Sequence, residues 1–186
     1  MRIDYTPVTE VPGSRASAEQ LARLYHRYHT AAQYALGKRV LEIACGAGLG
    51  LGYLARITEF LVGGDYTENL LHIAQSHYQG KVPLVCLDAH HLPFRDQAFD
   101  LIILFEAIYY FKQPEKFIIE SRRVLSDHGA ILICTVNKDW PEFTPSALSI
   151  RYFSVPELHD LLTKNGFRNL QFFGAFPASA ISLKKK

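Results

Sequence analysis

The sequence predicts an α/β protein built on a doubly wound, mostly parallel β-sheet with helices on both faces. Five short runs rich in Val, Ile and Leu carry apolar residues on both faces, which is typical of strands that helices cover on both sides. Segments of helical length alternate with these runs, and such alternation produces parallel sheets. The chain has 186 residues, 48% of them hydrophobic, which is enough for one core. We therefore expect a single domain over residues 1–186.

The first element expected is a helix over Ser14 to Leu36. Leucines and tyrosines recur there at helical spacing, and Gly37 follows as a stop signal. Because this helix precedes the alternating region, we expect it to form an N-terminal cap over residues 14–36. The core would then occupy residues 38–176.

The strands and helices of the core follow in turn. Strands are expected at residues 40–45, 60–64, 82–87, 100–105 and 130–136. Helices are expected at residues 51–57, 67–78, 114–125 and 154–165. In a doubly wound sheet, ligands bind beyond the carboxyl ends of the strands, so the residues that follow each strand are the candidate site.

The C-terminal edge of the sheet is expected to be incomplete. Phe167 to Phe176 would be a sixth strand, but Pro177 to Lys186 begin with proline and end with lysines, a composition that disfavours a return strand. An open sheet edge invites pairing with another chain. We therefore expect either self-association, for example as a homodimer, or a longer natural chain whose further residues cover that edge.

Composition excludes several function classes. The net charge is only +2 and part of it lies in the terminal lysines, so no nucleic-acid partner is expected. The longest apolar run, Leu101 to Phe111, contains Glu106 and is too short to cross a bilayer, and the N-terminus shows no signal-peptide pattern. We expect no membrane insertion and a cytoplasmic location. The cysteines are scattered singly and the adjacent His90 and His91 point apart, so no metal is expected.

The strongest local signal is a strand that runs into a glycine-rich turn over Val40 to Gly50. Glycines there allow the backbone to approach a ligand closely, although a tight turn into a helix also needs glycine without any ligand. A dinucleotide fingerprint would require a third glycine where Leu51 or Tyr53 stands, which disfavours a nicotinamide cofactor. Cys45 lies in this loop and could touch a ligand.

Carboxylates follow the next two strands. Asp65 could accept hydrogen bonds from both hydroxyls of a ribose, or it could cap the next helix, a role that Thr67 could also take. Asp88 could accept a hydrogen bond from an adenine amino group, while the backbone amide of Ala89 could donate to the ring.

Taken together, these strand ends resemble the class I S-adenosylmethionine-dependent methyltransferases over Lys38 to Gly166. The loop Glu42-x-Ala44-x-Gly46-x-Gly48 is similar to the acidic-x-Gly-x-Gly-x-Gly loop of that family, with alanine at the first glycine position. The segment from Gly64 to Thr67 resembles the ribose-binding strand end, and Asp88-Ala89 resembles the adenine loop.

The resemblance implies a Rossmann-like methyltransferase fold and S-adenosylmethionine as the cofactor. Its methionine part would lie along Glu42 to Gly48, a stretch that includes Ala44, Cys45 and Gly46. Its ribose would meet Asp65, and its adenine would lie beside Asp88 and Ala89 with Tyr66 as the apolar flank.

The acceptor site is expected at the end of the fourth strand. Leu104, Phe105 and Glu106 would form the edge of the channel that leads to the methyl group. Related small-molecule enzymes often carry Glu-x-x-Glu-His there, whereas this chain has Tyr109 and Tyr110 in place of the second carboxylate and the histidine. The two tyrosines could line an acceptor pocket or pack beneath the next helix.

No strong base is evident at this position, because a phenol with a pKa of about 10 is a poor proton acceptor at neutral pH. The acceptor could arrive already nucleophilic, which we favour, or His29, Glu106 or Asp139 could take its proton. Asp139 follows the fifth strand, and His29 lies on the N-terminal helix. The irregular stretch Pro141 to Ser149 is expected to cover the acceptor.

The function expected from the sequence is methyl transfer from S-adenosylmethionine to a small-molecule, lipid-precursor or sugar acceptor. The alternatives are a nicotinamide-dependent oxidoreductase and a nucleotide-binding regulator without turnover. The missing third glycine of the fingerprint argues against the oxidoreductase. A regulator would bind the cofactor but would lack an acceptor pocket.

Overall fold

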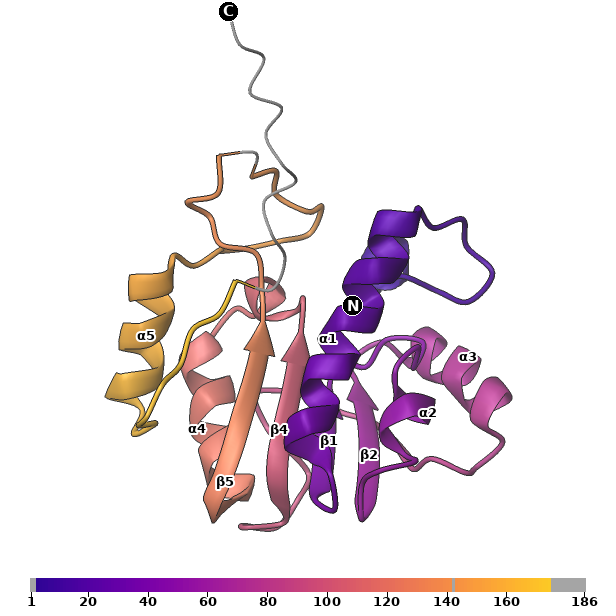
Figure 1. The fold of residues 1–186 in the computed structure, drawn as a ribbon, viewed down its shortest axis with the longest axis horizontal. Coiled ribbons are helices and arrows are strands. Elements are labelled where there is room, and N and C mark those ends of the chain that lie inside the picture. Colours follow the sequence, from indigo (N-terminus) through magenta and orange to yellow (C-terminus); the bar gives the residue numbers. More distant parts are fainter. Residues whose placement is uncertain (1–2, 142, 175–186) are drawn as a thin grey trace, which may run out of the picture.

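The computed structural model describes residues 3–141 and 143–174. Within them, five strands form one sheet in the order β3-β2-β1-β4-β5, and each pair of neighbours is parallel (Figure 1). The strands are β1 (Arg39–Ile43), β2 (Phe60–Asp65), β3 (Leu84–Cys86), β4 (Phe99–Phe105) and β5 (Leu125–Cys134). The predicted doubly wound α/β fold is confirmed.

Helices cover both faces of the sheet. They are α1 (Ala18–Ala35), α2 (Leu51–Leu54), α3 (Glu68–Tyr78), α4 (Pro114–Val124) and α5 (Val155–Lys164), with single 3-10 turns at Thr6–Val8 and Ile108–Tyr110. The buried residues of α1 and α2 pack on one face, and those of α4 and α5 pack on the other. The centre of β4 is apolar on both faces, because Leu101 and Ile103 face the first layer while Ile102 and Leu104 face the second.

Two helices begin at capping boxes that fix their first residues. The Ser17 hydroxyl accepts a hydrogen bond from the Gln20 backbone amide, and the Gln20 side chain accepts one from the Ser17 amide. Ser154 and Glu157 do the same for α5. Since a cap residue satisfies amides that the helix leaves free, α1 begins at Ala18 rather than at Ser14.

The C-terminal part of the sheet differs from the expectation. Strand β5 begins at Leu125, directly after α4, and a register irregularity between Phe99 and Leu101 accommodates this early start. The predicted sixth strand is wrong for residues 167–174, because Phe167 packs into the core beside α5 while Phe172 and Phe173 are exposed and pair with no strand. Its last two residues and the Pro177 to Lys186 segment lie outside the described residues. The described sheet therefore ends at β5, and self-association through this edge stays a prediction.

The strand order creates a crevice that positions the site. The chain leaves β3 at one edge and returns as β4 on the opposite side of β1, so the connections after β1 and β4 diverge. In a doubly wound sheet the space between such diverging connections is where ligands bind. Among residues 3–141 and 143–174, no helix is long and apolar enough to cross a membrane.

Candidate functional site

A cavity of about 590 Å³ lies beyond the carboxyl ends of the strands, a size in the range of small-molecule sites. Its wall combines the glycine-rich loop after β1, the ends of β2 and β4, the loop after β3 and part of the N-terminal segment. Of the residues predicted to form the site, those that line this cavity are Glu42, Ala44, Cys45, Gly46, Asp65, Tyr66, Asp88, Ala89, Phe105, Glu106, Tyr109 and Tyr110. The fold thus gathers segments that lie far apart in the sequence around one cavity.

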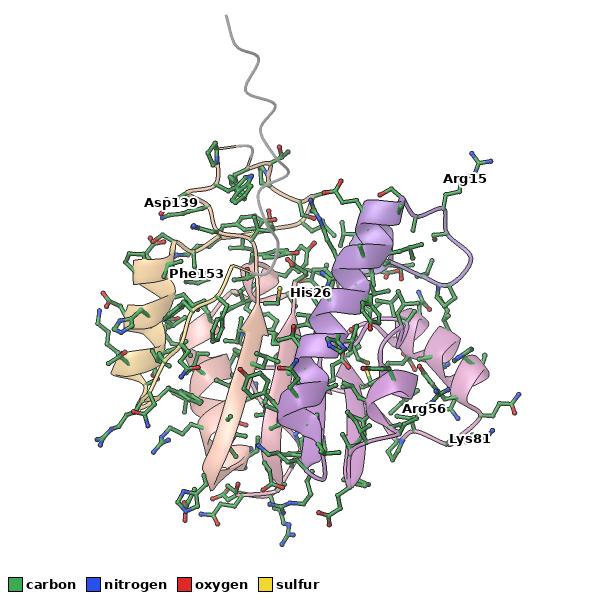
Figure 2. The ribbon with its side chains drawn as sticks, viewed as in Figure 1. Arg15, His26, Arg56, Lys81, Asp139 and Phe153 are labelled. Atoms are coloured by element: carbon green, nitrogen blue, oxygen red, sulfur yellow. The ribbon has the colours of Figure 1, made fainter. Side chains whose placement is uncertain are left out.

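Four expected residues do not line the cavity. Leu104 is 0% exposed because it faces the layer of α4 and α5. Gly48 is buried against the Tyr78 ring, where an added Cβ would lie 2.9 Å from a ring carbon. His29 is exposed on α1 and stacks on Tyr25, with ring centroids 5.5 Å apart. Asp139 is exposed in the turn after β5 and points away from the domain (Figure 2).

The backbone is strained where β1 and β4 end side by side. Ala44 has a φ of 57° and Glu106 a φ of 49°, both in the left-handed region that non-glycine residues rarely adopt. Such strain costs about 1 to 3 kcal/mol per residue and persists where surrounding structure enforces it, most often at functional sites. The alanine in the first glycine position of the loop is therefore not a neutral replacement.

Asp65 ties the glycine-rich loop to the start of α3. Its two carboxylate oxygens accept hydrogen bonds from the Gly46 amide at 2.8 Å and from the Thr67 amide at 2.7 Å. Thr67 stands at the N-cap position of α3 but makes no side-chain cap bond, because its hydroxyl instead accepts a hydrogen bond from the Tyr5 amide. A carboxylate has about four acceptor positions, so Asp65 retains capacity for a ligand that enters the cavity.

Glu42 is a buried acid with an unused oxygen. It is 1% exposed, and the Tyr28 hydroxyl donates to its Oε1 at 2.5 Å, while its Oε2 has no hydrogen-bond partner. Burial raises the pKa of Glu42 to about 7, although the Tyr28 hydrogen bond and the charge of Arg27 act to lower it. Burying a carboxylate without full compensation is costly, so this oxygen marks a place for a cationic partner.

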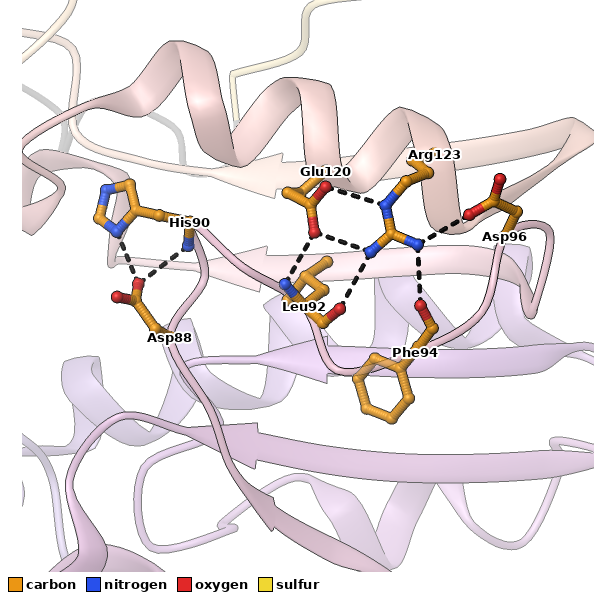
Figure 3. A network of polar contacts seen from close by, with 7 residues as sticks. All are labelled: Asp88, His90, Leu92, Phe94, Asp96, Glu120 and Arg123. Atoms are coloured by element: carbon orange, nitrogen blue, oxygen red, sulfur yellow. Dashed lines mark hydrogen bonds and ion pairs between the residues drawn. The ribbon is translucent and has the colours of Figure 1, made fainter.

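The loop after β3 is held by two separate sets of polar contacts (Figure 3). The Asp88 Oδ1 accepts hydrogen bonds from the His90 backbone amide at 2.9 Å and pairs with His90 Nδ1 at 2.6 Å, which leaves Oδ2 for a ligand. Farther along, the Arg123 guanidinium donates to the Leu92 and Phe94 carbonyls. It also pairs with Glu120 and Asp96, and Glu120 accepts from the Leu92 amide. This clamp fixes the loop without using the residues that face the cavity.

Tyr109 and Tyr110 both line the cavity and pack into the protein. Tyr109 stacks on Tyr152 with ring centroids 4.4 Å apart, and the Tyr110 hydroxyl is 2.7 Å from the Ser146 hydroxyl. Burial raises the pKa of both phenols, so they are neutral at physiological pH. The Ser146 contact attaches the Pro141 to Ser149 stretch, which we expect to cover the acceptor, to this wall of the cavity.

The N-terminal segment and α1 contribute cavity residues that no sequence motif indicates. Tyr5 packs on Tyr66 and Tyr110, with centroid distances of 6.3 and 5.1 Å, and Arg27 of α1 reaches Glu10 and Glu106. Arg27 could have been identified from the sequence, because it lies next to the buried positions that recur at helical spacing along α1. No periodic pattern marks residues 3–10, so nothing local could have placed Tyr5 in the site.

In the described part of the chain, no group of three or more His, Cys, Asp or Glu side chains is arranged to hold a metal ion. The polar side chains that line the cavity include carboxylates, phenols and the Arg27 guanidinium, together with Thr9, His90, His91, Lys112, Gln113 and Lys116. This set suits an organic ligand that carries both positive charge and hydroxyl groups.

Comparison with known proteins relates this geometry to a family. The family model described as a methyltransferase domain matches residues 41–133, half of the chain. A Mycobacterium ulcerans protein named "Probable phthiotriol/phenolphthiotriol dimycocerosates methyltransferase 2" is 35% identical over 147 residues, which are 73% of this chain and 55% of that protein. The demethylmenaquinone methyltransferase of Clavibacter sepedonicus is 33% identical over 100 residues, 53% of this chain and 41% of that protein.

Solved structures agree with the sequence comparisons. An S-adenosylmethionine-dependent methyltransferase from Thermotoga maritima matches with a TM-score of 0.63 and 26% identity, over 79% of this chain and 71% of that one. The chain spans about half the length of the curated relatives described above. The matched segment runs from β1 to β5 and contains the loop, the strand ends and most of the cavity wall described above. The chain belongs to the class I S-adenosylmethionine-dependent methyltransferase family.

Proposed function

We propose that this chain transfers a methyl group from S-adenosylmethionine to a small, largely apolar acceptor of the lipid-precursor or quinone-like kind. The observation that carries the proposal is the buried Glu42 Oε2, which has no partner and belongs to a residue on the cavity wall. S-adenosylmethionine has an ammonium group and a sulfonium centre, so it supplies the positive charge that this carboxylate lacks.

The remaining polar groups of the wall suit the rest of the cofactor. The Arg27 Nε is buried without a partner and suits the cofactor's carboxylate. Asp65 retains acceptor positions for the ribose hydroxyls, Asp88 Oδ2 suits the adenine amino group, and Tyr66 would flank the base. Ala44 and Gly46, which adopt left-handed backbone in the turn after β1, are small and leave room at the cavity wall for the methionine part.

The bound cofactor supplies an activated methyl group on its sulfonium sulfur. The task of the chain is then to hold an acceptor in line with that group and to exclude water. Phe105, Tyr109 and Tyr110 form the apolar and phenolic wall at the end of β4. Tyr5 packs against both Tyr110 and Tyr66, so it extends this wall toward the proposed adenine side.

The character of this wall favours an aromatic or lipid-like acceptor over a sugar. Ring faces offer dispersion contacts to flat apolar molecules, whereas a sugar needs many directed hydrogen bonds. The names of two relatives point the same way, since one refers to phthiotriol dimycocerosates and the other to demethylmenaquinone.

Two measurements test the proposal. Thermal unfolding in the presence of S-adenosylmethionine or a nicotinamide dinucleotide identifies the cofactor, because a ligand that binds only the folded state raises the Tm. We expect a rise with S-adenosylmethionine alone. Incubation with methyl-labelled cofactor and mixtures of phenols, quinols and hydroxylated lipids, followed by mass analysis, identifies the acceptor. A Tm rise with the nicotinamide cofactor alone would favour an oxidoreductase, and cofactor binding with no methylated product would favour a regulator.

A further inference from the structure

Glu106 is held more loosely than the acids Glu42, Asp65 and Asp88 of the cavity wall, each of which makes a contact of 2.8 Å or less. Its side chain is 28% exposed, yet no hydrogen-bond or ion-pair contact of the carboxylate is shorter than 3.4 Å. The Tyr109 hydroxyl lies 3.4 Å from Oε2, the Arg27 guanidinium 3.4 Å from Oε1, and the Cys134 thiol 3.6 Å from Oε1. Hydrogen bonds to carboxylates are usually near 2.5 to 2.9 Å, so the acceptor capacity of Glu106 is largely unused.

We propose that Glu106 is the catalytic proton acceptor and that the methyl acceptor is a protic oxygen compound, a phenol or an enol, which enters between Glu106 and the Tyr109–Tyr110 wall. This proposal rests on the proposed function and adds the identity of the base and the chemical class of the acceptor. It replaces the expectation that the acceptor arrives already nucleophilic.

The other acids and bases are excluded by position or by their contacts. His29 and Asp139 do not line the cavity. Asp65 accepts two short hydrogen bonds from backbone amides, and Glu42 accepts one from Tyr28. Cys45 is a buried thiol whose pKa is raised by burial, and Lys112 and Lys116 are exposed lysines beside the start of α4. The remaining acids and histidines of the cavity wall lie on the loop after β3 and on the N-terminal segment.

On that loop, Asp88 and His90 are paired with each other at 2.6 Å, and both lie on the side of the cavity that suits adenine. His91 belongs to the same loop and is exposed. Glu10 is exposed and pairs with Arg27 at 3.6 Å. Among these acids, only Glu106 lies in the strained turn after β4 and next to the wall formed by Tyr109 and Tyr110.

The fold holds Glu106 ready to accept a proton. Its φ of 49° places the residue in a backbone conformation that is rare for glutamate, and such strain is found where a side chain must be presented to a ligand. Burial raises the pKa of the Glu106 carboxyl, and the charge of Arg27 opposes this and favours the ionised form. Arg27 is thus a positioning residue, with a side chain that is 12% exposed.

The proposed step is balanced in atoms and electrons. The acceptor O–H bond breaks and its proton moves to Glu106 Oε2, while an oxygen lone pair forms the new O–CH₃ bond. The S–CH₃ bond breaks and its electron pair returns to sulfur, which leaves a neutral thioether. Glu106 then returns its proton to solvent as the product leaves. No further oxidant, reductant or metal is needed.

Two phenols that differ in acidity provide the test. At about pH 8, 4-methylphenol with a pKa of about 10 is protonated, whereas 4-nitrophenol is largely ionised. In Glu106→Gln, we expect kcat for 4-methylphenol to fall by about 100-fold or more, the size of a lost general base, and kcat for 4-nitrophenol to fall by less than about 5-fold. Glu106→Asp keeps a carboxylate on a residue type that tolerates left-handed backbone, so it should restore part of the 4-methylphenol rate.

A binding measurement without turnover complements the kinetics. The absorbance of 4-nitrophenol, titrated with pH on the protein saturated with S-adenosylhomocysteine, reports the pKa of the bound phenol. A nearby carboxylate disfavours the phenolate, so this pKa should be about 1 unit or more higher in the wild type than in Glu106→Gln. The exposed Glu115→Gln serves as the matched control and should equal the wild type in all assays.

Each outcome has a defined meaning. Equal loss of both rates in Glu106→Gln, or an unchanged pKa of bound 4-nitrophenol, would show a structural role and overturn the proposal. Failure of the wild-type protein to bind either phenol would overturn the acceptor class. Calorimetry with S-adenosylmethionine separates these results from failure of the proposed function, since a protein that binds no cofactor refutes methyl transfer itself.

Discussion

The burial of Glu42 makes a prediction about stability that can be measured without knowing the acceptor. The change is Glu42→Gln, which keeps the shape of the side chain and an oxygen that can accept the Tyr28 hydrogen bond. It removes the ionisable group. The folded-state pKa of Glu42 is about 7, against 4.5 for an unperturbed glutamate. At 1.36 kcal/mol per pKa unit, ionised Glu42 costs the folded protein about 3 kcal/mol.

The direction of the pH dependence follows from proton binding. Between pH 4.5 and about 7, folded wild-type protein holds a proton on Glu42 that the unfolded chain does not hold. The stability that protonated Glu42 contributes is therefore fully present below pH 4.5 and is lost as the pH rises through about 7. We expect the stability of Glu42→Gln relative to the wild type to increase by up to about 3 kcal/mol across this window.

Urea unfolding of both proteins at several pH values between about 4.5 and 8.5 measures this difference, provided that both unfold in a two-state manner. Only the change of this stability difference with pH tests the prediction. Burying the amide of the new glutamine can also alter the stability, but by an amount that does not depend on pH. Glu115→Gln, at an exposed position of α4, should show a difference that stays flat. A flat difference for Glu42→Gln as well would refute the account of Glu42 as a buried acid.

The same carboxylate links stability to ligand binding. Calorimetry should show that Glu42→Gln weakens S-adenosylmethionine binding by about 1.5 to 3 kcal/mol, the size of a hydrogen bond to a charged group. In the wild type, binding should strengthen as the pH rises through about 7, because the cationic ligand requires ionised Glu42. A variant that is more stable at high pH yet binds more weakly would show that the buried charge is kept for function.

Three further predictions follow from single contacts. Asp65→Ala should lower the free energy of unfolding, and in calorimetry it should weaken S-adenosylmethionine binding by about 1.5 to 3 kcal/mol. An unchanged affinity would show that Asp65 does not bind the ribose. Tyr78→Phe breaks a hydroxyl bridge between the Gly48 carbonyl and the Gly52 amide, and it should weaken cofactor binding by about 1 kcal/mol while the exposed Tyr53→Phe has no effect. Ala44→Gly should raise the free energy of urea unfolding by about 1 kcal/mol through relief of left-handed strain, and a loss of stability would show that the alanine methyl packs favourably.

Much of the fold was predictable because its signals are local. Apolar runs, glycine stops and helical spacing lie within stretches of fewer than about 20 residues, and each constrains the backbone where it stands. The motif residues that follow β1, β2 and β3 were found for the same reason, since a parallel sheet brings successive carboxyl ends to one edge. The sixth strand failed because a suitable composition does not create a pairing partner, and the phenylalanines at 172 and 173 meet none.

The sequence by itself determined the fold class, the family and which strand ends form the cavity, because these depend on order and local pattern. Only the tertiary structure decided which side chains face that cavity. The side to which Leu104 points depends on the register of β4 between two helical layers. The approach of Arg27 to Glu106 depends on how α1 packs across the sheet. Side-chain direction is set by packing between elements distant in sequence, and no local pattern encodes it.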